Sequence, residues 1–279
     1  MKKIFVILMA ALLSCSLVAC GNNDKIVLSD DDNIADELEY KNFIYEVNED
    51  GTYEIVKYKK GETVPAKLEI PEKIGEIEVT GIGDNAFTSC KTMESVTIPA
   101  TVKYIGISAF RDCDELTAVQ IPDSVKEIGI AAFFGCDKLT TVKLPAGLKK
   151  IEMVTFKNCK VLTGVVLPEG LEAIDEAAFW GCEALTEITI PATVKDMGDA
   201  AFYECKGLKK ATVVGSALGA AEVVGEGEDA ETVEHFIGKI VFNGCPDLEI
   251  KWEENTIFAE YAKANDYKAY KAPVETNAQ

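Results

Sequence analysis

Apolar residues recur at a constant interval of 23 residues through the middle of the chain. A column of phenylalanines is followed, three residues later, by a column of cysteines. Their members are Phe87, Phe110, Phe133, Phe156, Phe179 and Phe202, and Cys90, Cys113, Cys136, Cys159, Cys182 and Cys205. Each unit also contains an apolar-x-apolar step such as Val96-x-Ile98, which predicts a short strand with one buried face. A proline follows (Pro99 in the first unit) and ends the strand, because it has no N–H for a ladder.

The interval predicts the architecture. A period in the twenties is typical of a leucine-rich-repeat solenoid, in which each repeat forms one coil and buries its apolar face against its neighbours. A second extended piece, with Val102 and Ile105 in the first unit, follows the proline. We therefore expect about seven coils of 23 residues, mostly β in content (α/β by the convention for this class), with an N-terminal β-hairpin cap and a C-terminal helical cap.

Three sequence elements resemble a known family. A-F-x-x-C, L-x-x-V-x-I-P and V-x-x-I-G are similar to the BspA-type (Treponema pallidum-type) leucine-rich repeat of bacterial surface proteins, over residues from about 63 to 250. The resemblance implies a curved solenoid. It also implies a class of function, because several members of that family bind host matrix proteins or act as adhesins.

Departures from the repeat predict the ends of the solenoid, which we place at residues 63–250. Upstream, apolar residues alternate around Asn48-Glu49-Asp50-Gly51, a hairpin signal, so residues 40–62 are expected to form the N-terminal cap. The first unit has five extra residues, and Gly75 to Val79 fits a small hairpin there. Downstream, residues 215–236 interrupt the last repeat as an insertion.

The C-terminal part, residues 251–279, is expected to be a cap and a tail. Asn255 to about Asn265 has a helical apolar spacing behind an asparagine that would serve as the N-cap. The tail is expected to begin near Ala272.

The start of the chain predicts export and anchoring. Lys2 and Lys3 precede an apolar run from Ile4 to Leu13, which suits a signal peptide and is too short to span a bilayer. Leu17-Val18-Ala19-Cys20 resembles the bacterial lipoprotein processing box, which implies a signal peptide over residues 1–19 and lipidation of Cys20. The alternative is an ordinary secretory peptide with an incidental cysteine. Residues 20–39 are polar and acidic and are expected to form a tether. We predict an extracytoplasmic protein, anchored to a bacterial membrane and exposed at the cell surface.

Charge limits the partners. The chain has 28 basic and 47 acidic residues, for a formal net charge of −19 at pH 7. A field of that sign repels phosphate backbones, which excludes nucleic acid as a partner.

The periodic cysteines have three interpretations. In an exported protein they could pair as disulfides. However, all six occupy one position of the repeat, where stacked side chains point in parallel, so buried free thiols are favoured. No pair has the spacing of a metal-chelating knuckle, so no metal site is predicted.

No pattern in the chain predicts catalysis or a cofactor. H-E-x-x-H, G-x-S-x-G and C-x-x-C are absent from the sequence. The two G-x-G-x-x-A matches, at Gly81 and Gly225, are a set of ordinary repeat positions and an acidic loop, so neither predicts a dinucleotide site. His235 is the single histidine, and in a polar insertion we expect it to be solvated.

Two sets of positions are candidates for ligand binding. On the main strand, outward positions are short and mostly uncharged, and they would form a flat concave face; the candidates are Thr97, Gln120, Lys143, Thr189 and Thr212. Small, β-branched residues also simply pack well on a sheet. The second set is the position after each phenylalanine, which varies and is therefore expected to be exposed. There Phe134, Trp180 and Tyr203 would form an aromatic ledge, or else pack locally or at a dimer contact.

Three functions remain open from the sequence. The leading prediction is non-catalytic binding of an extracellular protein through the concave face and the ledge. The second is a carbohydrate-binding component of a surface glycan uptake system, in which the same aromatic residues would stack on sugars. The third is a structural spacer in the envelope without a ligand.

Overall fold

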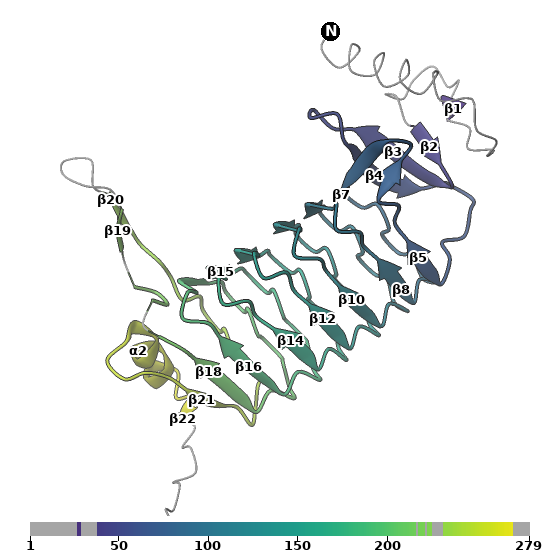
Figure 1. The fold of residues 1–279 in the computed structure, drawn as a ribbon. Helices are drawn as coiled ribbons and strands as arrows, with labels where there is room; N and C mark the ends of the chain where they lie inside the picture. Colours follow the sequence, from purple (N-terminus) through teal and green to yellow (C-terminus); the bar gives the residue numbers. More distant parts are fainter. Residues whose placement is uncertain (1–26, 29–37, 216, 221, 225–230, 270–279) are drawn as a thin grey trace, which may run out of the picture.

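The computed structural model describes residues 27–28, 38–215, 217–220, 222–224 and 231–269 (Figure 1). The chain forms an elongated stack of coils with a cap at each end, as the repeat predicts. Strands from successive coils pair in parallel at a shift of 23 residues, for example Val119 with Val142 and Val142 with Val165. No helix among the described residues is long and apolar enough to cross a membrane.

The apolar-x-apolar step forms the main sheet, in two hydrogen-bonded sections. The first has the order β14-β12-β10-β8-β5 and the second β16-β18-β21-β22. The strands are β5 (Lys67–Glu69), β8 (Ser95–Thr97), β10 (Ala118–Gln120), β12 (Thr141–Lys143), β14 (Gly164–Val166), β16 (Glu187–Ile190), β18 (Lys210–Val213), β21 (Glu249–Lys251) and β22 (Lys268–Ala269). The central apolar residue of each of these strands from β5 to β21 is buried, which follows from the period of two.

The piece after the proline forms a second sheet, also in two hydrogen-bonded sections, β7-β9-β11 and β13-β15-β17. Its strands are β7 (Ile77–Ile82), β9 (Tyr104–Ile105), β11 (Glu127–Ile128), β13 (Lys150–Ile151), β15 (Ala173–Ile174) and β17 (Asp196–Met197). Met197 then forms a parallel bridge with Ile237, so the chain rejoins the repeat after the insertion.

A continuous stack of phenylalanine rings fills the centre of the rod. Neighbouring rings from Phe87 to Phe202 are nearly parallel, with centroids 5.2 to 5.6 Å apart. Phe242 extends the stack across the insertion, at 5.3 Å from Phe202. Each ring contacts only the coils beside it, so stability is expected to be the sum of contributions from adjacent coils.

The cysteines form a ladder of thiols beside the rings. All seven described cysteines are free, as favoured above, and the five from Cys113 to Cys205 are buried. Each of these Sγ atoms donates to the phenylalanine carbonyl of the preceding coil, as Cys136 does to Phe110 at 3.2 Å. Burial raises the pKa of Cys182, and it raises that of Cys245 to about 12. A cysteine therefore fills a small apolar space and still satisfies a carbonyl.

The N-terminal cap is the predicted hairpin, extended upstream. β1 (Val27–Leu28), β2 (Leu38–Tyr40), β3 (Phe43–Val47) and β4 (Tyr53–Tyr58) pair in antiparallel order, and β4 then pairs in parallel with β7. β6 (Lys73–Ile74) and β7 form the second predicted hairpin. β1 and the first residues of β2 lie in the segment predicted as a tether, because the apolar residues beside the acidic run are able to pair as strands.

The insertion contains a hairpin of its own. β19 (Glu222–Val224) and β20 (Glu231–Val233) pair in antiparallel order, and β18 ends just before residue 215, where the insertion was predicted to begin.

The C-terminal cap is the helix α2 (Ile257–Ala264), which buries Phe258, Ala259 and Ala262. Its N-cap is Thr256, whose Oγ accepts from the backbone N–H of Ala259 at 3.0 Å. The prediction of an asparagine cap is therefore wrong by one residue. Asn255 instead adopts a left-handed conformation, φ 61°, that leads the chain into the helix. Beyond α2, β22 adds a further strand to the main sheet, which the repeat pattern did not predict.

Candidate binding surface

The outward face of the main sheet brings the predicted strand positions into register. Gln120 pairs with Lys143, and Thr189 pairs with Thr212, each on the adjacent strand. Thr97, Gln120, Lys143 and Thr189 are exposed, whereas Thr212 is half-buried. The five candidates therefore point to one side of the solenoid, but they belong to the two separate sections of the sheet.

The centre of this face is nearly uncharged. Across β10, β12 and β14 the outward residues carry a single charge, that of Lys143. They are Ala118, Gln120, Thr141, Lys143, Gly164 and Val166. Val166 is 82% exposed, more than any other large apolar residue of the described chain. In a chain of net charge −19, this strip is the part of the sheet face that a partner would desolvate at the lowest cost.

The position after each phenylalanine forms a column on the edge of the rod, here called the slot column. It comprises Thr88, Arg111, Phe134, Lys157, Trp180 and Tyr203. The Arg111 guanidinium lies 4.5 Å from the Phe134 ring centroid, and the Lys157 ammonium lies 3.7 Å from that of Trp180. Trp180 and Tyr203 meet edge to face at 4.7 Å.

These contacts correct the predicted ledge in two respects. All three aromatic residues are half-buried rather than exposed. Trp180 contacts Tyr203, but Lys157 separates Phe134 from Trp180, so the three rings do not form one continuous aromatic strip. Cation–π attraction and ring packing hold the side chains in this order.

The packing also limits what Trp180 is able to bind. Lys157 lies over its ring, and Tyr203 approaches it from the neighbouring coil. A sugar that stacks needs a free ring face, so Trp180 would have to lose one of these contacts first. The column is better suited to contacts with ring edges and cations, as at protein interfaces.

Left-handed turns fix the backbone of the slot column. The residue after each slot position has a positive φ, for example Gly135 at 68° and Gly181 at 73°. Its N–H donates to the slot carbonyl of the next coil, as Gly135 does to Lys157 at 2.9 Å. Glycine adopts this conformation without strain at two of the six positions, and the hydrogen bond from each of these residues to the next coil keeps the column in register.

His235 does not lie where the sequence predicted. Its side chain is only 9% exposed, and its Nδ1 lies 2.9 Å from Asp196 Oδ2. The other oxygen of Asp196 accepts from the backbone N–H of Phe236 at 2.9 Å. Asp196 thus fixes the end of the insertion to β17, a contact that a separation of 39 residues hides from sequence inspection.

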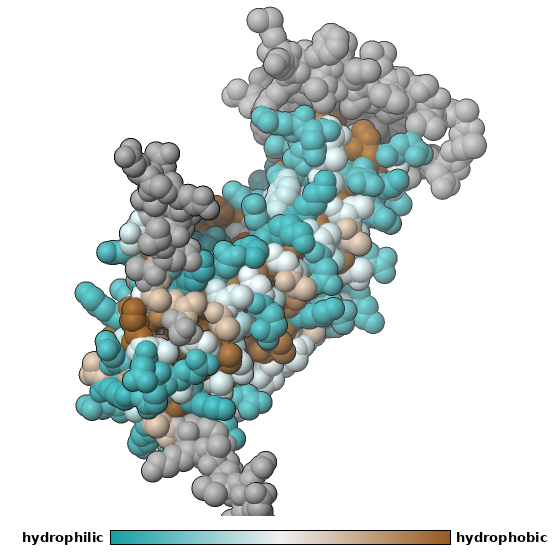
Figure 2. All heavy atoms as spheres, turned by 60° about the vertical axis from the view of Figure 1, so that its left-hand side comes forward, coloured by the Kyte–Doolittle hydropathy of each residue, from teal (hydrophilic) through white to brown (hydrophobic). Residues whose placement is uncertain are grey.

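Sequence reasoning missed a group of exposed apolar residues near the C-terminal cap. Phe236, Ile240 and Ile257 are 53%, 43% and 46% exposed. On the face shown in Figure 2, hydrophobic residues lie in separate spots on a mostly hydrophilic surface, several of them near this end. Ile257 lies in the cap helix, outside the repeat, and the repeat pattern does not mark Phe236 or Ile240 as exposed.

The described residues contain no cluster that would suit a metal ion. No three His, Cys, Asp or Glu side chains among them gather as a possible metal site. Cys20 lies outside the described residues, so its predicted lipidation stays a prediction.

Comparison with known proteins agrees with this geometry. Residues 80–209 match the family described as the BspA type leucine rich repeat region, in six copies. The fold is similar to that of the T. pallidum leucine rich repeat protein, at 24% identity and a TM-score of 0.50, over 77% of this chain and 80% of that one. A leucine rich cell surface protein from Faecalibacterium prausnitzii is 30% identical, with a TM-score of 0.52, over 73% of this chain and 58% of that one. No curated protein matches the chain significantly in sequence.

Proposed function

We propose that the chain, whose residues 80–209 belong to the BspA type leucine rich repeat family, is a non-catalytic surface protein that binds a protein partner on the outward face of its main sheet. The observation that carries the proposal is the nearly uncharged strip across β10, β12 and β14, in which Lys143 is the single charged residue and Val166 is 82% exposed at the edge. Depletion of charge at the centre of a patch is typical of protein interfaces.

The slot column is proposed as a second contact of the same partner. Arg, Trp and Tyr are the residue types that most often dominate the energy of protein interfaces. Here they are held in a fixed order by their own contacts, so binding would cost little side-chain entropy. The same packing argues against sugar stacking on Trp180, which is why a protein is the preferred partner.

Anchoring at Cys20 is part of the proposal. A lipidated Cys20 would hold the solenoid at a bacterial membrane, since acyl chains contribute about 0.8 kcal/mol per buried CH2 group. The name of the similar Faecalibacterium prausnitzii protein, a leucine rich cell surface protein, supports display at the cell surface.

The test is binding of the soluble chain from Asn22 to Gln279 to an array of extracellular-matrix proteins and glycans. Val166→Glu places a charge in the strip and is expected to weaken protein binding at least about tenfold, because a buried unpaired charge costs more than 1.4 kcal/mol. Trp180→Ala combined with Tyr203→Ala tests the slot column separately.

Val161→Glu is the matched control. Val161 belongs to the same coil and is 39% exposed, but it follows Cys159 and lies off the main sheet, so its substitution is expected to leave binding unchanged. Equal binding by the wild type and Val166→Glu would contradict the proposed surface. Absence of saturable binding to any protein would favour a spacer, and binding to glycans alone would favour an uptake component.

A further inference from the structure

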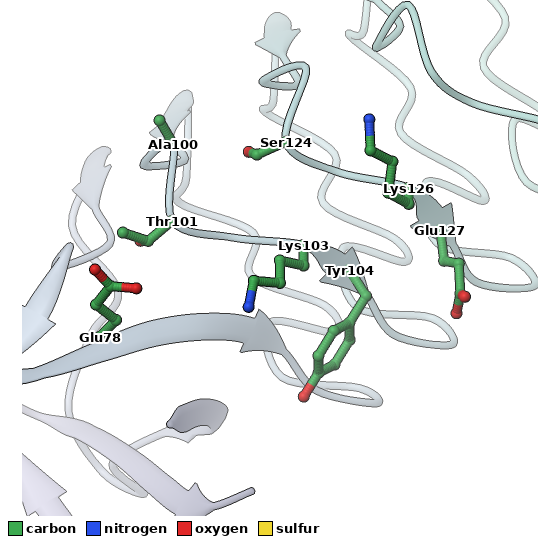
Figure 3. Close-up of a pocket in the computed structure, with 8 residues that line it drawn as sticks. All are labelled: Glu78, Ala100, Thr101, Lys103, Tyr104, Ser124, Lys126 and Glu127. Atoms are coloured by element: carbon green, nitrogen blue, oxygen red, sulfur yellow. The ribbon is translucent and has the colours of Figure 1, made fainter. Parts of the chain in front are cut away.

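A hollow of about 600 Å³ lies on the side of the second sheet, away from the outward face of the main sheet (Figure 3). Its lining comes from β7, from the loop before β9, and from the next coil. The lining residues are Glu78, Ala100, Thr101, Lys103, Tyr104, Ser124, Lys126 and Glu127. Its volume falls in the range of about 300–1,000 Å³ that is usual for small-ligand sites.

The extra residues of the first unit account for this hollow. They form the β6–β7 hairpin, so β7 spans Ile77–Ile82 whereas β9 and β11 have two residues each. Glu78 lies on the part of β7 that continues past β9, and the following coils have no equivalent. Figure 3 shows Glu78 on β7 near Thr101 and Lys103 of the next coil, and these three side chains line one part of the hollow. Later coils of the solenoid lack this arrangement.

The polar groups of the hollow include some that the protein itself leaves unused. Ser124 Oγ is buried and has no hydrogen-bond partner among the described residues. The Thr101 hydroxyl makes only a long contact, 3.4 Å, to the carbonyl of Glu72. Lys126 Nζ donates to a backbone carbonyl, that of Asp123, at 3.0 Å. Donors and acceptors are therefore available to a ligand.

The charges of the lining favour a ligand without a net charge. Lys103 and Lys126 balance Glu78 and Glu127, so the site has no net charge of its own, and the whole chain carries −19. An ion of either sign would lie beside two like charges as well as two opposite ones, so the lining itself gives no net attraction to an ion, and the surrounding field repels anions further. A neutral ligand that both donates and accepts hydrogen bonds fits this inventory.

Tyr104 supplies an aromatic side chain with its polar end already occupied. Its hydroxyl hydrogen-bonds Glu54 and lies 3.2 Å from Asn48 Oδ1, both in the N-terminal cap. The ring therefore keeps a fixed position, close to the backbone of Gly81, and it is the aromatic ring of the lining (Figure 3). Carbon surface beside carboxylates, ammonium groups and hydroxyls matches a pyranose, which has an apolar face and a rim of hydroxyls.

From these observations we infer that the hollow is a binding site for a neutral saccharide unit, separate from the proposed protein-binding face. Hydroxyl groups of the sugar donate to Glu78 and accept from Lys103 and Ser124. The site adds recognition of a sugar to a protein whose main sheet binds a protein partner.

The experiment is calorimetric titration of the purified chain with glucose, galactose, N-acetylglucosamine and their disaccharides. Glucuronic acid and glucosamine serve as charged comparisons. Saturable binding of at least one neutral sugar is expected in the millimolar range. Glu78→Gln and Lys103→Met are each expected to weaken it at least about tenfold, because each removes a charge-assisted hydrogen bond. Both side chains are on the surface, and circular dichroism would verify the fold of each variant.

Lys149→Met is the matched control, since Lys149 has the repeat position of Lys103 and Lys126 but does not line the hollow. It is expected to bind like the wild type, as is Val166→Glu, which separates this site from the protein-binding face. No saturable binding at about 10 mM of any neutral sugar would overturn the inference. So would equal binding by the two lining variants, or a preference for the charged sugars.

Discussion

At the N-terminal end of the solenoid, β4 continues the second sheet by pairing with β7, whereas at the C-terminal end β22 continues the main sheet by pairing with β21. The two ends share one device. The last ring of the phenylalanine stack is covered edge-on by another aromatic ring, Phe43 on Phe87 at one end and Tyr267 on Phe242 at the other. Their interplanar angles are 86° and 89°.

The difference lies in what holds each cap. In the N-terminal cap, Glu54 and Asn48 bond to Tyr104, and Thr52 bonds to Thr80. The C-terminal cap combines the apolar side of α2, with Phe258 buried, with longer hydrogen bonds of two tyrosine hydroxyls: Tyr261 accepts from the Val241 N–H at 3.3 Å and Tyr267 donates to Asn243 at 3.4 Å. Both ends of this solenoid thus share two features: an aromatic ring covers the last phenylalanine of the stack, and one of the two sheets continues into the cap. The other contacts between cap and solenoid differ from one end to the other. The uncovered edge strand β5 is short and flanked by Pro65 and Pro71, which hinders pairing with another chain.

The largest effect is expected from removing the covering rings. Phe43→Ala should lower the free energy of unfolding of the N-terminal end by about 3–5 kcal/mol, because Phe43 is almost fully buried. Tyr267→Ala should cost less, about 1–2 kcal/mol, since Tyr267 is half-buried. Hydrogen exchange of the amides of Phe87 and Cys245 measures the two ends separately.

Phe236→Ala is the control for this comparison, because Phe236 is 53% exposed and its removal should change stability by less than about 0.5 kcal/mol. Equal loss of protection at both ends in Phe43→Ala would mean that the rod unfolds as a single unit, and would contradict the independence of the caps.

A smaller effect is expected at the start of α2. Thr256→Ala removes the acceptor for the Ala259 N–H and should destabilise the C-terminal cap by about 1 kcal/mol. Urea unfolding followed by the fluorescence of Trp252, with Trp180 replaced by Phe, reports on this end. Thr256→Ser keeps the hydroxyl and should restore most of the loss. Equal urea midpoints for Thr256→Ala and Thr256→Ser would show that the hydrogen bond of the N-cap side chain does not contribute to the stability of α2.

The smallest effect is a pH dependence confined to the N-terminal cap. Burial raises the pKa of Glu54, although its hydrogen bond with Tyr104 acts in the opposite direction. A carboxyl whose pKa is higher in the folded state binds its proton more tightly there. The stability it contributes is present below the unfolded pKa and is lost as pH rises through the folded pKa.

Glu54→Gln should therefore become more stable relative to the wild type between about pH 4 and about pH 7, as measured by urea midpoints. Glu260→Gln, at an exposed position of α2, is the control at the other end and should show no such trend. A wild-type advantage that grows with pH would mean that the Tyr104 hydrogen bond outweighs burial.

The predictions made from the repeat were confirmed, whereas several predictions about contacts between segments distant in the chain were wrong. The phenylalanine and cysteine columns became the ring stack and the thiol ladder, and the two N-terminal hairpins formed where the turn residues predicted them. The predictions that failed were the solvated His235, the exposed aromatic ledge and the cap at Asn255. The hollow beside Glu78 was not predicted, although the five extra residues of the first unit were the signal for it.

Periodicity was sufficient for the solenoid because each coil contacts only its neighbours, so a local pattern repeated at 23 residues specifies the whole stack. The repeat spacing does not specify the side-chain contacts made by the insertion and the caps. Whether Asp196 reaches His235 and which ring covers Phe242 depend on how the insertion and the C-terminal cap place side chains that are far apart in the chain. Those contacts arise only when the coils stack, and a spacing along the sequence does not encode them.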